Sequence, residues 1–86
     1  MITCQVGELN FGLVFRDEPS TAIPMKLKGF KKTPKMVAAV KQFNLRPGGT
    51  GAYVSGTAQS PTSAEIKVSA YGGNANVMAT YVVCGN

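Results

Sequence analysis

Two stretches near the end of the chain alternate apolar and polar residues, and this pattern constrains the fold more than any other feature of the sequence. In residues 64–71, Ile66, Val68 and Ala70 occupy every second position, with mostly polar residues between them. Residues 77–83 follow after a short segment of turn-forming residues. Alternation of this kind is typical of a β-strand with one buried face. The two stretches therefore predict a β-hairpin.

The rest of the chain divides into short strands separated by turns. Residues 17–20, 32–34, 47–51 and 60–63 contain the Gly, Pro, Asp or Ser residues that turns favour. We predict strands at residues 2–6, 10–16, 23–30, 36–43, 52–58, 64–71 and 76–84. Short strands in this arrangement indicate an all-β fold. We therefore expect a single domain over residues 1–86, forming a small antiparallel β-sandwich of six to seven strands.

The two cysteines bear on the stability of so small a domain. A domain of this length buries only about two thirds of its unfolded surface, so a covalent link or a partner is expected to add stability. Cys4 and Cys84 lie near opposite ends of the chain. A disulfide between them would stabilise the fold by about 4 kcal/mol in the loop-entropy model. Neighbouring terminal strands would bring the thiols together, but the same positions also suit two buried free cysteines.

The sequence lacks the residues on which most catalytic and metal sites depend. It has no histidine, and its four acidic residues are scattered. Asp17 and Glu18 are adjacent in a predicted loop, where neighbouring carboxylates are more often solvated than an acid–base pair. Two thiols without a histidine cannot complete a tetrahedral metal set. We therefore predict a non-enzymatic protein with no cofactor and no metal.

The whole chain has a net charge of +5, and its positive charge is concentrated in one segment. The basic residues there are Lys26, Lys28, Lys31, Lys32, Lys35 and Lys41. Such a segment can attract nucleic acid, an anionic glycan or an acidic protein, and lysine also protects sheet edges against strand addition. Aromatic residues that stack on bases are not interleaved with these lysines, because Phe30 and Phe43 are expected in the core. Nucleic acid is therefore not the expected partner.

Three sequence features follow one another along almost the whole chain. Gln5-Val6-Gly7 opens it, Phe30 precedes a proline-led apolar strand at residues 34–40, and Tyr81 lies on the last strand after the paired strand 64–71. In this order and spacing the chain resembles the H-type lectin family. That family is the sugar-binding β-sandwich of snail agglutinins and discoidin C-terminal domains, also found at the tips of bacteriophage tail fibres.

The resemblance implies a six-stranded sandwich that assembles as a homotrimer, burying an apolar face that one small protomer cannot cover. Our candidates for that oligomer interface are Tyr53, Val54 and Tyr81. In the family, sugar lies between protomers and contacts an arginine on a middle strand and an aromatic–histidine pair before the last strand. This chain has no arginine around Tyr53 and no histidine at all, so the sugar specificity of the family does not carry over.

The loop before the last strand is the candidate ligand-binding site. Tyr71 falls on the predicted solvent face of its strand, where its ring can stack on the apolar face of a sugar. The residues that follow it in the candidate site are Gly72, Gly73, Asn74 and Asn76. The asparagine amides can hydrogen-bond a ligand, but the same residue types also make ordinary turns.

Two functions of different class follow. The first is a bacteriophage virion protein that binds a host-surface glycan or receptor through loops. The second is a purely structural capsid or tail protein, a decoration or connector that contacts other virion proteins and binds no sugar. No apolar run approaches the roughly 20 residues of a membrane span, and no signal peptide follows Met1. We therefore expect no membrane insertion and a virion protein assembled in the host cytoplasm.

Overall fold

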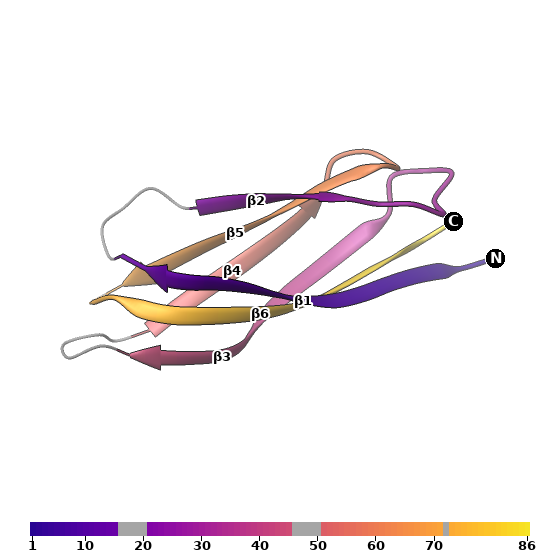
Figure 1. Ribbon diagram of the computed structural model, residues 1–86. Coiled ribbons are helices and arrows are strands. Elements are labelled where there is room, and N and C mark those ends of the chain that lie inside the picture. The colour runs from indigo at the N-terminus through magenta and orange to yellow at the C-terminus, as the bar shows by residue number, and fades with distance from the viewer. Residues whose placement is uncertain (16–20, 46–50, 72) are drawn as a thin grey trace.

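The fold places six β-strands in two sheets. The computed structural model describes residues 1–15, 21–45, 51–71 and 73–86, and within these residues every regular element is a strand (Figure 1). All pairings are antiparallel, in the strand orders β1-β6-β3 and β2-β5-β4. The prediction of an all-β, antiparallel protein is confirmed. The strands are β1 (Thr3–Val14), β2 (Thr21–Lys26), β3 (Lys35–Leu45), β4 (Gly51–Ala58), β5 (Ser63–Tyr71) and β6 (Ala75–Gly85).

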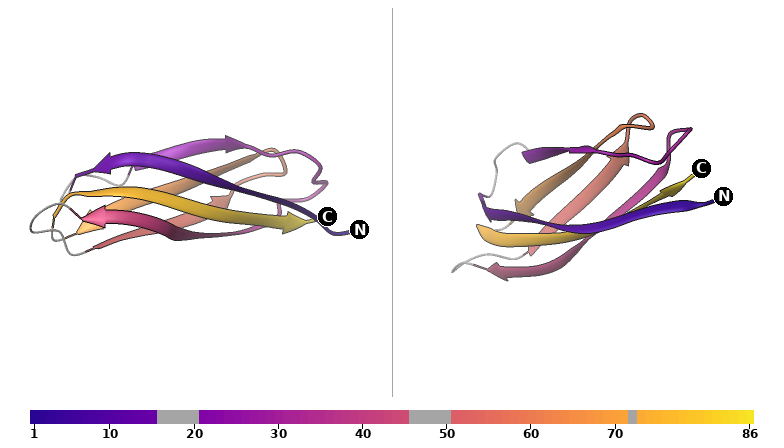
Figure 2. Two further views of the ribbon diagram at one scale, coloured as in Figure 1. Left: turned by 60° about the horizontal axis from the view of Figure 1, so that its bottom comes forward. Right: turned by 45° about the vertical axis from the view of Figure 1, so that its right-hand side comes forward.

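The two sheets lie face to face in an elongated molecule of 47 × 20 × 14 Å (Figure 2). Each sheet has an inner face toward the core and an outer face toward solvent. On β5, Ile66 and Val68 are buried, whereas Lys67 between them is exposed. The alternation in the sequence thus decides which face of the strand meets the other sheet.

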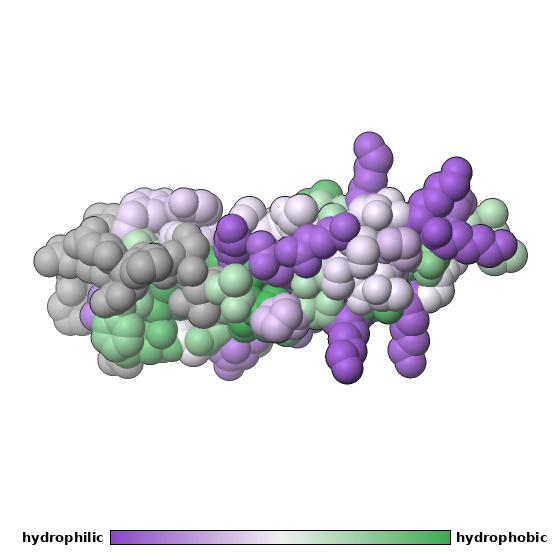
Figure 3. Space-filling view, turned by 90° about the horizontal axis from the view of Figure 1, so that it is seen from above, coloured by the Kyte–Doolittle hydropathy of each residue, from purple (hydrophilic) through white to green (hydrophobic). Residues whose placement is uncertain are grey.

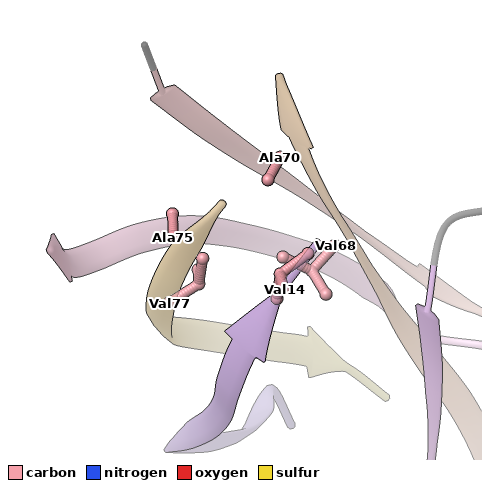
Figure 4. Close-up of a cluster of buried hydrophobic side chains, with 5 residues drawn as sticks. All are labelled: Val14, Val68, Ala70, Ala75 and Val77. Carbon is pink, nitrogen blue, oxygen red and sulfur yellow. The ribbon is translucent and has the colours of Figure 1, made fainter. Parts of the chain in front are cut away.

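The core between the sheets is narrow because it consists largely of valine and alanine. In one cluster, Val14 and Val77 from the β1-β6-β3 sheet lie opposite Val68 from the other sheet (Figure 4). Short side chains bury little apolar area, and burial stabilises by about 25 cal/mol per Å². A covalent link or a partner is therefore expected to add to the stability that this core provides. The buried hydrophobic residues are Val14, Leu27, Phe30, Ala64, Ile66, Val68, Ala70, Ala75, Val77, Ala79 and Val83.

The first two predicted strands, residues 2–6 and 10–16, form the single strand β1. Glu8 does not interrupt it, because this residue points to the outer face, where its carboxylate accepts a 2.6 Å hydrogen bond from Lys41. A register shift between Asn10 and Gly12 keeps β1 paired with β6, and Gly12 adopts a φ of 68° there. The predicted strand 23–30 is also shorter than expected, since β2 ends at Lys26.

The terminal strands β1 and β6 are neighbours, and a disulfide joins them. Cys4 lies directly opposite Cys84 in the pairing register. Their Cα atoms are 4.2 Å apart and the Sγ atoms are bonded, across 80 residues of sequence. The alternative of two free thiols is therefore not the state of this structure, and the cross-link connects the two ends of the chain within one sheet.

Replacing both cysteines, as Cys4→Ser/Cys84→Ser, should lower the free energy of unfolding by about 4 kcal/mol, because a long closed loop restricts the unfolded chain strongly. Urea denaturation followed by far-UV circular dichroism measures this loss. Reducing the wild-type protein should have the same effect, since Cys4 is exposed. A double-serine variant as stable as the wild type would contradict the prediction.

Candidate binding site

Two tyrosines lie together on the outer face of the β2-β5-β4 sheet. Tyr53 is on β4 and Tyr71 ends β5, and they are diagonal neighbours because Tyr71 pairs with Gly51. Their ring centroids are 6.4 Å apart with the planes tilted by 40°, a distance typical of interacting aromatic rings. Tyr53 is 59% exposed and Tyr71 is 51% exposed. We call these two residues the tyrosine pair.

Gly51 allows the ring of Tyr71 to lie across the neighbouring strand. A Cβ atom at position 51 would be only 2.6 Å from the hydroxyl oxygen of Tyr71 and 2.7 Å from its Cζ. Any larger residue on β4 would therefore displace the end of the ring. An aromatic ring covering a cross-strand glycine is a known way to fix an exposed aromatic side chain on a sheet.

The face around the tyrosine pair is polar. The row after Tyr53 holds Ser55 on β4 opposite Lys67 on β5, and the next row holds Thr57 opposite Glu65. Lys67 Nζ is 3.7 Å from Glu65 Oε1. Hydroxyl, ammonium and carboxylate groups beside an exposed aromatic surface can bind the hydroxyl groups of a ligand that stacks on the rings.

The loop after Tyr71 presents less surface than the sequence suggests. Gly73 is buried, and Asn74 is half-buried. Asn76 lies on β6, half-buried and opposite Leu13 of β1, while Gly72 lies outside the described residues. Among the predicted ligand-binding residues that the structure describes, Tyr71 is the exposed one, and its neighbour is Tyr53 rather than the loop.

The three residues expected at the oligomer interface do not form one exposed face. Val54 is half-buried and packs against the core cluster, because consecutive residues of a strand point to opposite faces and Tyr53 points outward. Tyr81 also faces inward. It packs against the cluster of Leu27 and Phe30, and a Cβ atom at Gly7 would be 2.5 Å from its hydroxyl oxygen. Of the three, Tyr53 is the one on an outer face, and their role at an interface stays a prediction.

An apolar surface that the sequence analysis missed lies on the outer face of the β1-β6-β3 sheet. Val6 of β1 and Val37 of β3 both lie opposite Val82 of β6. Their exposed fractions are 68%, 70% and 43% for Val6, Val37 and Val82 respectively. We call these residues the valine row. Only the pairing register reveals it, since the three residues are far apart in sequence.

The described residues contain no metal site and no pair of neighbouring carboxylates. No group of three His, Cys, Asp or Glu side chains comes together in them. Glu8 pairs with Lys41 and Glu65 with Lys67, on the outer faces of different sheets. Asp17 and Glu18 lie outside the described residues. No helix in the part of the chain that the structure describes is long and apolar enough to cross a membrane.

Comparison of the chain with family models, with curated proteins and with solved structures finds no match. The exposed surfaces described above are therefore the features that bear on function.

Gly51→Ala should separate the tyrosine pair without unfolding the protein. The added methyl group meets the far end of the Tyr71 ring, which can swing away, so the free energy of unfolding should change by less than about 1 kcal/mol. Nuclear Overhauser effects between the ring protons of Tyr53 and Tyr71 should weaken or vanish. Ser55→Ala on the same face is the control and should preserve them. Unchanged contacts between the two rings in Gly51→Ala would show that the Tyr71 ring does not depend on the space above Gly51.

Proposed function

We propose that this protein is a non-enzymatic bacteriophage virion protein, a homotrimer that binds a glycan or receptor on the host surface. The exposed tyrosine pair is the observation that carries the proposal. The two solvent-facing rings lie on neighbouring strands and outside the buried core. They resemble the aromatic surfaces on which proteins bind apolar ring faces.

The tyrosine pair suits a sugar because it combines stacking with nearby hydrogen-bonding groups. The tilt of 40° between the rings lets a pyranose ring lie on one tyrosine while its edge meets the other. Ser55 and Lys67 lie in the adjacent cross-strand row, within reach of sugar hydroxyl groups. Because both rings are on strands rather than in a loop, binding orders little of the backbone and loses little conformational entropy.

The valine row is our revised candidate for the trimer interface. Exposed apolar residues that gather on one sheet face mark association surfaces in small proteins. In a homotrimer whose axis faces this sheet, Val82 of the middle strand β6 meets its equivalents from the other protomers. The tyrosine pair then points away from the axis, since it lies on the outer face of the opposite sheet.

The disulfide is consistent with a protein that acts outside the cell. Disulfides persist in oxidising surroundings and are rare in the reducing cytoplasm. Cys4 is exposed on the outer face of its sheet, so oxidation after release of the particle can form the bond with Cys84. The disulfide and the resemblance to the lectins of tail-fibre tips both support the proposed setting on a virion surface.

A purely structural role is the second candidate, and the valine row favours it. The same apolar face that suits a homotrimer can also pack against a different virion protein. A structural protein would bind no glycan, and the tyrosines would then serve only to cover Gly51 and the edge of β4. Binding measurements with tyrosine variants separate the two functions.

Tyr71→Ala should weaken glycan binding about tenfold, because a stacked tyrosine contributes on the order of 1–2 kcal/mol. An array of bacterial surface oligosaccharides identifies the best ligand, and isothermal titration calorimetry then measures its affinity. Tyr53→Ala should behave likewise, and Tyr71→Phe, which keeps the ring, is the matched control. If the folded wild-type protein binds no glycan on the array, the structural role replaces this proposal.

Val82→Lys should dissociate the trimer into folded monomers. Val82 is 43% exposed, so the substitution spares the core but places like charges together at the axis. Light scattering should report a fall from three times the protomer mass to the protomer mass of 9.0 kDa. Thr57→Lys, on the outer face of the other sheet, should remain trimeric. A monomeric wild-type protein at micromolar concentration would overturn the trimer.

A further inference from the structure

One end of the molecule carries a cluster of exposed lysines. They lie on the segment that leaves β2 and enters β3, and all are exposed. Hydrophilic side chains project from this end in the space-filling view (Figure 3). We call this cluster the lysine end, and it consists of Lys26, Lys28, Lys31, Lys32 and Lys35.

The backbone that carries these lysines is held in place. Leu27 and Phe30 are buried, and Pro34 is buried as well. The amide of Leu27 donates a 2.9 Å hydrogen bond to the carbonyl of Thr62. The amides of Lys31 and Lys32 both donate to the Asn86 carbonyl, at 2.7 and 3.2 Å. The ammonium groups therefore project from a fixed frame, which reduces the entropy that binding must overcome.

The positive charge of the lysine end is not neutralised by the acidic residues that the structure describes. These are Glu8 and Glu65, and each has its own lysine, Lys41 and Lys67 respectively. Several like charges within a short segment repel one another. Salt screens charges only beyond a Debye length of about 8 Å at physiological ionic strength, so the fields of neighbouring lysines add. An anionic ligand relieves this repulsion.

Two adjoining hollows lie among the lysines. One, of about 320 Å³, is lined by Ile2, Pro34 and the disulfide-bonded Cys84 together with Lys32 and Lys35. The other, of about 370 Å³, is lined by Met1, Thr3, Gly29 and Lys31, and Asn86 borders both. Each falls within the range of roughly 300–1,000 Å³ that ligand pockets occupy.

We infer that the lysine end is a binding site for an acidic polysaccharide, a sugar chain that bears carboxylate groups. Lys32 and Lys35 would pair with carboxylates, and the apolar lining of the hollow beside them suits the C–H face of a sugar ring. A nucleic acid fits less well, because Phe30, the aromatic residue of this segment, is buried and cannot stack on bases.

This site is separate from the tyrosine pair and does not depend on it. Lys26 lies opposite Ser63, at the start of β5, whereas Tyr71 ends the same strand. At about 3.3 Å per residue, the two places are roughly 26 Å apart along β5. Loss of binding at one should leave the other intact.

Binding of the intact protein to alginate, a linear polyuronate, tests the inference, with dextran as the neutral reference. Lys32→Gln/Lys35→Gln should weaken alginate binding about tenfold or more. The matched control is Asn10→Asp/Lys41→Gln, which lowers the net charge equally at exposed positions outside the lysine end and should change affinity less than about twofold. Lys32→Arg/Lys35→Arg keeps the charge and should retain most of the binding. Raising the salt from about 50 to 200 mM should weaken the wild-type complex.

Tyr71→Ala should bind alginate as the wild type does, which separates this site from the proposed glycan site on the tyrosines. Equal losses in Lys32→Gln/Lys35→Gln and in Asn10→Asp/Lys41→Gln would mean a non-specific effect of net charge and would overturn the inference. Dextran bound as well as alginate would do the same. So would a single-stranded oligonucleotide bound more tightly than alginate.

Discussion

The antiparallel pairing of β1 with β6, with Cys4 opposite Cys84, is the constraint on which the rest of the structure depends. Along β1 and β6, every second residue pair faces outward, so the pair next to the disulfide on this face, Val6 and Val82, belongs to the valine row. The pairs between them face inward and place Tyr81 over Gly7. A slip by one residue would turn the valines into the core and Tyr81 into solvent. The disulfide therefore fixes the register as well as joining the ends of the chain.

A narrow core leaves most of the chemical diversity of this protein on its outside. Valine and alanine make up most of the core between the sheets, and one outer face carries the valine row while the opposite face carries the tyrosine pair. The lysine end is remote from the tyrosine pair but adjoins the valine row, because Lys35 pairs with Cys84 one outward row from Val37 and Val82. Small β-sheet proteins place such surfaces on paired strands and on anchored connections because these positions are rigid. The tyrosine pair can then change without disturbing the lysine end.

The sequence predicts the fold class better than it predicts the binding surface. Alternation in residues 64–71 identified β5 and its buried face, because burial of every second residue follows directly from strand geometry. The tyrosine pair needed the register of β4 against β5, which sets Tyr53 beside Tyr71. Individual strand patterns carry no register between strands. Val54 is a different case, because alternation along β4 alone puts it on the face opposite to Tyr53, where it packs against the core cluster.

In the proposed trimer, the arrangement of the surfaces has a consequence for attachment strength. If the valine row faces the axis, the three tyrosine pairs point outward, and a host surface with repeated glycans can engage more than one at a time. A single stacked ring contributes on the order of 1–2 kcal/mol, which is weak binding. Linked sites raise overall affinity by about 10²–10⁴ when the geometry allows simultaneous contact. A small domain with a modest site can therefore attach firmly through assembly, which makes the valine row as important for binding as the tyrosines.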